Sequence, residues 1–128
     1  MKILLDTHIL LWAAMGELPT IAEYYIENKA NVLYFSSASI WEIVIKNGLG
    51  HKDFIVDPAE LYEGLLSAGY CELPITSHHT LLVSTLPQLH KDPFDRILMG
   101  QAMREGMPIL TADKILTQYP CAVIYARL

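Results

Sequence analysis

The sequence predicts an α/β fold, a three-layer α/β/α sandwich with a central parallel sheet of about five strands. Short β-like runs alternate with helical stretches, the order that produces a parallel sheet covered by helices. The chain has 128 residues, which suits one domain spanning 1–128 and is too short for two ordinary ones. With 52% hydrophobic residues and a mean hydropathy of +0.29, it can bury a sizeable core.

The expected elements follow one another in a regular order. Strands are expected at residues 2–6, 32–36, 71–74, 108–111 and 121–125. Helices are expected near residues 7–14, 20–29, 37–48, 58–68, 76–84 and 93–105, with a short one near 113–117. Three helix starts carry a capping residue followed three positions later by an acid, at Thr20, Asp57 and Asp92. Pro58 and Pro93 suit the first helical position, where no partner is needed for the missing N–H.

The helix expected at 37–48 has an unusual surface. Apolar residues nearly encircle it: Ile40, Trp41, Ile43, Val44 and Ile45. Such a helix is either deeply buried or has an additional interface. Its narrow polar stripe consists of Ser39, Glu42 and Lys46, which share one face. Glu42 is therefore either a residue that forms a salt bridge or a ligand placed for binding.

Composition narrows the classes of function. A net charge of −5 is not that of a protein that grips nucleic acid by bulk electrostatics, so such a role requires a local basic patch and bound metal. Cys71 and Cys121 show neither metal spacing nor a disulfide framework, which indicates reduced thiols. Asp6 and His8 interrupt any signal-peptide core, and the apolar run 9–15 is too short to span a bilayer. We expect a soluble, cytoplasmic protein without membrane association.

Four acids are expected to meet at one edge of the sheet. Asp6 ends the first strand and Asp113 follows the fourth. Glu42 lies in the first two turns of the helix after the second strand, and Asp95 lies in the first turn of the helix that leads into the fourth. Open parallel sheets bind ligands beyond the carboxyl ends of their strands, which is where these elements place all four side chains.

Each acid also has an ordinary structural explanation. Asp95 fits a helix-capping pair with Asp92, and Glu42 fits an ion pair with Lys46. Asp113 fits a cap of the last short helix. Asp6 fits a structural role least well, because an acid ending an apolar strand adds little to sheet packing. Together, the four acids favour a site.

The chemistry of such a site is that of a hard divalent cation. Clustered carboxylates repel one another, and their oxygens suit Mg²⁺ or Mn²⁺, which activate water for attack on a phosphodiester. Hydroxyls that could hold a carboxylate or a metal-bound water, or act only as caps, are Thr7, Ser39 and Thr111. Cations close in sequence to these acids could bind phosphate or form local charge pairs: Lys46, Lys91, Arg96 and Lys114. The five histidines form no metal cluster by spacing, and none is assigned a role.

Four segments carry a family resemblance. They are Leu5-Asp6-Thr7-His8, the stretch from Ser39 to Lys46, His90-Lys91-Asp92-Pro93-Phe94-Asp95-Arg96, and Leu110-Thr111-Ala112-Asp113. With these segments in order from residue 2 to about 125, the chain resembles PIN-domain ribonucleases, in particular the VapC-type toxins of toxin–antitoxin pairs. The Asp-Pro-Phe-Asp-Arg block with its downstream Thr-x-Asp is more specific than any single acid.

The resemblance implies a PIN-like fold with strand order 3-2-1-4-5 and Mg²⁺- or Mn²⁺-dependent endonucleolytic cleavage of RNA. By matching position, the catalytic and metal-binding acids are Asp6, Glu42, Asp95 and Asp113, whereas Asp92 caps its helix. The strand order also places the two cysteines on opposite edges, which excludes a disulfide. The resemblance further implies an inhibitory antitoxin and a homodimer, with candidate partner surfaces at Trp12, Trp41, Tyr24 and Tyr25, although the core is the expected place for Trp41.

Two other classes of function compete with this interpretation. The first is a catalytically silent PIN-like module that binds RNA or protein, which the loss of one acid would support, and none is lost. The second is a Mg²⁺-dependent phosphatase on a related sheet, which normally needs an Asp-x-Asp pair, whereas position 8 is His8. The identities of the RNA target and the antitoxin stay open.

Overall fold

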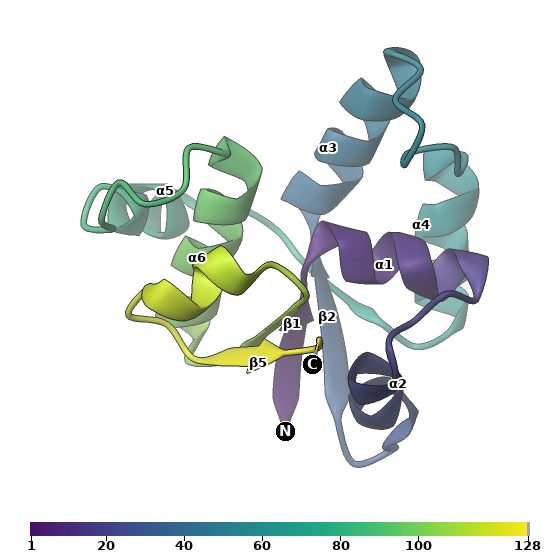
Figure 1. Cartoon of the computed structure of the whole chain (residues 1–128), viewed down its shortest axis with the longest axis horizontal. Coiled ribbons are helices and arrows are strands. Elements are labelled where there is room, and N and C mark those ends of the chain that lie inside the picture. The colour runs from purple at the N-terminus through teal and green to yellow at the C-terminus, as the bar shows by residue number, and fades with distance from the viewer. Residues whose placement is uncertain (128) are drawn as a thin grey trace.

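Residues 1–127 are described by a computed structural model, shown in Figure 1. Its strands are β1 (Lys2–Leu5), β2 (Val32–Ser36), β3 (Cys71–Leu73), β4 (Ile109–Thr111) and β5 (Val123–Tyr125). Its helices are α1 (Thr7–Met15), α2 (Thr20–Glu27), α3 (Ser37–Gly48), α4 (Pro58–Ser67), α5 (Ser77–Val83) and α6 (Pro93–Glu105), followed by the short 3₁₀ helix η1 (Lys114–Gln118). The predicted order of elements is confirmed, and the last short helix is 3₁₀ rather than α-helical.

The five strands form one parallel sheet in the order β3-β2-β1-β4-β5, as predicted. β1 lies at the centre, where Leu4 is opposite both Tyr34 of β2 and Ile109 of β4. Both cysteines are free; Cys71 lies in edge strand β3, and Cys121 lies just before the other edge strand, β5. Because all strands run the same way, their carboxyl ends share one edge, which places the residues after β1 and β4 together.

Helices cover both faces of the sheet, and β1 shows why. Ile3 and Leu5 point to one face and pack with α1, α2 and α4, whereas Leu4 points to the other face and packs against α6. All three side chains are fully buried. A strand that is apolar on both faces needs a layer of helices on each side, and this produces the α/β/α sandwich (Figure 1).

Helix α3 buries its polar face and exposes part of its apolar face, the reverse of an ordinary surface helix. Its polar residues Ser39 and Glu42 are buried, whereas Trp41 is 62% exposed and Val44 is 48% exposed. The expectation that Trp41 lies in the core is therefore wrong, and of the two alternatives for this helix, deep burial does not hold. The polar stripe faces the interior because it borders the site described below. No helix among residues 1–127 is long and apolar enough to cross a membrane.

Candidate active site

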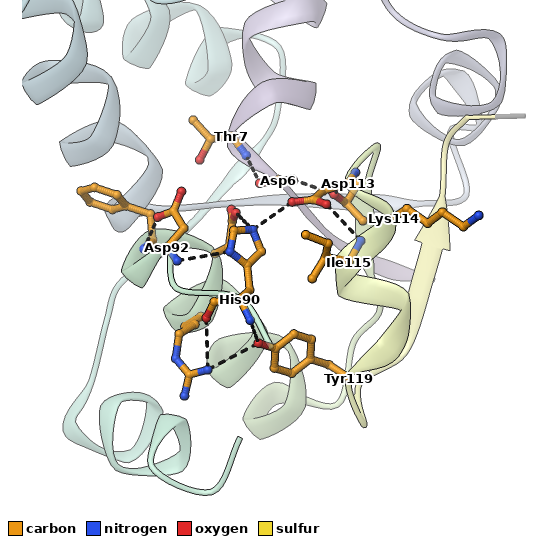
Figure 2. Close-up of polar contacts among 12 residues, drawn as sticks. Asp6, Thr7, His90, Asp92, Asp113, Lys114, Ile115 and Tyr119 are labelled. Carbon is orange, nitrogen blue, oxygen red and sulfur yellow. Dashed lines mark hydrogen bonds and ion pairs between the residues drawn. The ribbon is translucent and has the colours of Figure 1, made fainter. Parts of the chain in front are cut away.

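The four predicted acids line one cavity of about 520 Å³ at the carboxyl edge of the sheet. Figure 2 shows two of them, Asp6 and Asp113, with the polar contacts around them. Asp6 directly follows β1 and caps α1, and Glu42 comes from the second turn of α3. Asp95 lies in the first turn of α6, and Asp113 follows β4 and caps η1. Four elements that are distant in sequence thus bring their carboxylates to one place, as the strand-end argument predicts.

Asp6 is the most rigidly held of these acids. Its Oδ1 accepts a hydrogen bond from the Thr7 backbone N–H at 2.7 Å, and its Oδ2 accepts one from Thr111 Oγ1 at 2.7 Å. The side chain is almost fully buried. Burial raises the pKa of Asp6, and the hydrogen bonds from Thr111 and Thr7 only partly oppose that shift. Thr111 therefore orients a carboxylate, one of the two roles expected for it.

Glu42 has one satisfied and one unsatisfied oxygen. Its Oε2 lies 2.6 Å from Lys46 Nζ, the expected ion pair across one helical turn. Its Oε1 is buried and has no hydrogen-bond partner among residues 1–127. Burial lowers the pKa of Lys46, but the hydrogen bond and charge of Glu42 outweigh burial and raise it, so this lysine stays cationic. A buried carboxylate oxygen without a donor is costly unless a cation or water approaches it.

The pKa of Asp95 is raised by burial and by the other acids of the cavity. Burial is the largest cause of its shifted pKa, and the remaining causes are the charges of Asp6, Asp92, Glu42 and Asp113. Together they raise the pKa of Asp95 to about 9. A site that holds this carboxyl proton at neutral pH has an excess of negative charge, which a divalent cation would offset.

His90 lies between two of the acids. Its Nε2 is 2.9 Å from Asp95 Oδ2 and 3.0 Å from Asp113 Oδ2 (Figure 2). The three side chains form a group with ligand atoms close enough to hold a metal ion. No histidine is assigned a role from the sequence, because the five histidines form no metal cluster by spacing. The available signal for His90 was its place just before the Asp-Pro-Phe-Asp-Arg block, two residues before Asp92.

Asp92 is a cap, as expected. Its Oδ1 accepts a hydrogen bond from the Phe94 N–H at 2.9 Å at the start of α6. The hydroxyls of Thr7 and Ser39 bond each other, and Thr7 Oγ1 donates to Ser39 Oγ at 2.8 Å. They do not act as helix caps, because Asp6 caps α1 and Ser36 caps α3, and a contact with a metal-bound water stays a prediction. Their hydrogen bond ties the start of α1 to α3, beside Asp6 and Glu42.

Arg96 and Lys91 lie away from the acids. The two terminal nitrogens of Arg96 donate to the backbone carbonyls of Val83, Leu86, Pro87 and His90 and to Tyr119 Oη. The guanidinium is buried and stabilises the segment before α6, so it has no place in a phosphate site. Consecutive helical residues point about 100° apart, which separates Arg96 from its neighbour Asp95. Lys91 is exposed and lines a separate groove beside Trp41 and Phe94.

Two other cations line the cavity with the acids, Lys114 and Arg127. The Arg127 guanidinium lies 4.8 Å from the centre of the Trp12 ring, which also lines the cavity. His8 packs against Trp12 and Phe54. Arg127 was missed from the sequence because it is far from every acid along the chain and reaches the cavity only through the placement of β5.

The donor set suits a hard divalent cation. Carboxylate oxygens are the preferred ligands of Mg²⁺ and Mn²⁺, and the Glu42 Oε1 that lacks a partner lies with them. The residues that could hold such an ion are Asp6, Glu42, Asp95 and Asp113, with His90 in contact with the last two. The arrangement could bind one or more cations and an anionic substrate at its mouth.

Comparison with known proteins identifies the family of this chain. A family model for the PIN domain matches residues 3–120. The chain belongs to the PIN domain family. The search of curated proteins found no match to this sequence.

Solved structures share the fold of this PIN domain at low sequence identity. A chain of VapBC2 from Rickettsia felis, bound to a promoter DNA fragment, is 17% identical with a TM-score of 0.74, covering 99% of this chain and 100% of that one. DNA-bound VapBC from Salmonella typhimurium gives 16% identity and a TM-score of 0.71, covering 99% of each chain. A chain of a toxin–antitoxin complex from Klebsiella pneumoniae is 19% identical with a TM-score of 0.69, covering 98% of each chain.

Proposed function

We propose that this PIN domain is a metal-dependent endoribonuclease that acts as the toxin of a VapC-type toxin–antitoxin pair. The observation that carries the proposal is the cluster of four carboxylates in one cavity, two of them buried, with Glu42 Oε1 lacking a partner among residues 1–127 and Asp95 shifted to a pKa of about 9. A purely structural acid would have its own donors. This cluster instead has the charge and ligand type of a divalent-cation site.

The proposed roles follow from the contacts of each residue. Mg²⁺ or Mn²⁺ held by Asp6, Glu42, Asp95 and Asp113 would supply activation of water for in-line attack on an RNA phosphodiester. Thr111 fixes the orientation of Asp6 through its 2.7 Å hydrogen bond. Lys46 partly neutralises Glu42. Lys114 remains a candidate for phosphate contact and Arg127 is added, because both line the cavity, whereas Lys91 and Arg96 do not.

The proposed partners are an antitoxin protein and a second copy of the chain. Exposed apolar side chains support such partners, among them Trp41, Leu49 at 79% and Ile55 at 72% exposure. One structurally similar chain comes from a toxin–antitoxin complex of Klebsiella pneumoniae, which supports the same proposal. A cytoplasmic location accords with an RNA target.

Cleavage of RNA by purified protein tests the proposal. Wild-type protein should cut total cellular RNA with Mn²⁺ or Mg²⁺ and stop when EDTA is added. Asp95→Asn should lose at least 100-fold in rate, the order of magnitude expected when a group central to charge stabilisation is removed. Glu60→Gln is the matched control, because Glu60 lies in the first turn of α4, three residues after its capping Asp as Asp95 does in α6, and lies outside the cavity.

The outcomes separate the candidate classes. Cutting that needs both the cation and Asp95 supports the nuclease. Cation binding without any cutting of total RNA by folded protein contradicts the nuclease and favours a module that binds RNA or protein. Cutting that survives EDTA and Asp95→Asn is not due to this site, and it also contradicts the proposal.

A further inference from the structure

The His90 ring has a defined proton position. The Asp92 backbone N–H donates to His90 Nδ1 at 3.2 Å, so Nδ1 carries a lone pair and the neutral ring has its proton on Nε2. This proton is donated to Asp113 Oδ2, 3.0 Å from the nitrogen, and Asp95 Oδ2 lies 2.9 Å from the same nitrogen. His90 is therefore a donor to the Asp113 carboxylate, not an acceptor facing it; Figure 2 shows the contact between the two residues.

The backbone around His90 holds the ring in this place. The His90 N–H donates to Tyr119 Oη, and the His90 carbonyl accepts from Arg96, whose guanidinium also bonds the Pro87 carbonyl at 2.8 Å. The side chain is only 17% exposed. The imidazole is thus fixed from the segment that precedes α6 and is not free to rotate without losing the Asp92 contact.

The Asp113 carboxylate is positioned without His90. Its Oδ1 accepts from the Ile115 N–H at 3.0 Å, and the Asp113 N–H donates to Thr111 Oγ1 at 3.0 Å. Removing the imidazole would therefore leave the Asp113 carboxylate close to its present position.

We propose that His90 competes with the divalent cation for Asp113 Oδ2, so that cation binding has to displace its Nε2–H. The proposal rests on the proposed function, because it assumes that Asp113 and the acids around it bind a cation. Mg²⁺ and Mn²⁺ need a lone pair at about 2.0–2.2 Å, and a donor proton aimed at the same oxygen occupies that approach. By this competition His90 sets the cation concentration at which the site fills.

A ligand role for His90 makes the opposite prediction. To bind a cation through Nε2, the ring would have to move its proton to Nδ1, which would then face the Asp92 N–H donor to donor. The competing roles are therefore distinguished by the sign of one change, the change in cation affinity when the imidazole is removed.

The test is the affinity of EDTA-treated, buffer-exchanged protein for Mn²⁺, measured from free Mn²⁺ by electron paramagnetic resonance. His90→Ala should bind about tenfold tighter than wild type, the factor that corresponds to about 1.4 kcal/mol. His90→Gln, which can keep an N–H donor at this position, should lie between the two. His79→Gln is the matched control and should bind as wild type does, because His79 has the same ring contacts outside the cavity.

Weaker or unchanged binding by His90→Ala overturns the inference. If that variant does not fold, long-range ¹H–¹⁵N spectra of wild-type protein decide, with the His90 signals assigned from His90→Gln. Nε2 should be protonated and Nδ1 unprotonated both before and after Mg²⁺ is added. A shift of the proton to Nδ1 on addition of Mg²⁺ identifies a ligand and also overturns the inference.

Failure of the inference is distinguishable from failure of the proposed function. If Asp95→Asn abolishes Mn²⁺ binding while His90→Ala does not tighten it, only the role of His90 is lost. If wild type does not bind Mn²⁺, or binds it equally with and without Asp95, the cation site itself is wrong and both proposals fall.

Discussion

Two histidines of this chain are held in the same way but face different surroundings. In His79, Nδ1 accepts a backbone N–H from Thr76 at 3.0 Å, and Nε2 lies 2.9 Å from Glu105 Oε2. In His90, Nδ1 accepts from Asp92 and Nε2 faces the carboxylates of Asp95 and Asp113. In both rings, a backbone donor assigns the proton to Nε2 and directs it at an acid.

The surroundings separate the two roles. His79 is fully buried between α5 and α6, and its partner Glu105 reaches it from the surface with a side chain that is 40% exposed. His90 lies in an open cavity whose carboxylates repel one another. The same unit of ring, backbone donor and acid therefore ties two helices together in one place and borders the proposed cation site in the other. Geometry alone does not assign function, and the charge around the unit decides it.

The largest expected effect is a loss of stability when His79, the structural histidine of the two, is replaced. His79→Ala removes a buried ring and leaves the Thr76 N–H without its acceptor, and it should lower the free energy of unfolding by about 2–4 kcal/mol. Thermal unfolding monitored by circular dichroism should show a melting temperature roughly 10 °C lower. His78→Ala is the control, because the adjacent histidine is exposed and should change stability little. Equal effects of the two substitutions would contradict the structural role of His79.

The next largest effect is a pH dependence of the free energy of unfolding, which arises from Asp95 beside His90. In the unfolded chain Asp95 loses its proton near pH 4, whereas in the folded protein its pKa is about 9. Between these values the folded state binds more protons, so the free energy of unfolding should fall as pH rises through this window. Burial also raises the pKa of Asp6, which acts in the same direction.

Urea unfolding in EDTA between pH 5 and pH 8 measures this dependence. Wild-type midpoints should decrease with pH, and Asp95→Asn should flatten the slope because its amide does not titrate. Saturating Mn²⁺ should raise the wild-type midpoint most at pH 8, where the cation displaces the fewest protons. The same slope in Asp95→Asn would contradict the raised pKa of Asp95.

Arg96→Lys should have a smaller effect, and it tests how His90 is held. The lysine keeps the charge but loses the planar fork that bonds several carbonyls at once, so stability should fall by about 1–3 kcal/mol. Arg104→Lys, at an exposed position in the last turn of the same helix, is the matched control and should be neutral. A neutral Arg96→Lys, measured by urea unfolding, would mean that the segment before α6 does not depend on the guanidinium.

Local sequence patterns were enough to predict the fold and the place where the acids meet. Apolar runs define strands, and the rule that parallel strands share a carboxyl edge is enough to bring Asp6 and Asp113 together. The same reasoning could not identify His90, because its contacts depend on a loop whose path is fixed by Arg96 and Tyr119. Hydrophobicity also could not say which face of α3 meets solvent. Trp41 is exposed because the polar face of that helix is required at the cavity.

Glu105→Gln should give the smallest effect and sharpens the contrast between the histidines. The Gln amide oxygen can still accept from His79 Nε2–H, and the partly exposed carboxylate contributes little through its charge, so the loss should stay near 0.5 kcal/mol. The equivalent change beside His90, Asp113→Asn, should leave folding similarly intact but weaken Mn²⁺ binding by tenfold or more. Both variants are compared by urea unfolding in EDTA and by Mn²⁺ titration. If Glu105→Gln changed Mn²⁺ binding, or Asp113→Asn did not, the division between a structural and a cation-facing histidine would be incorrect.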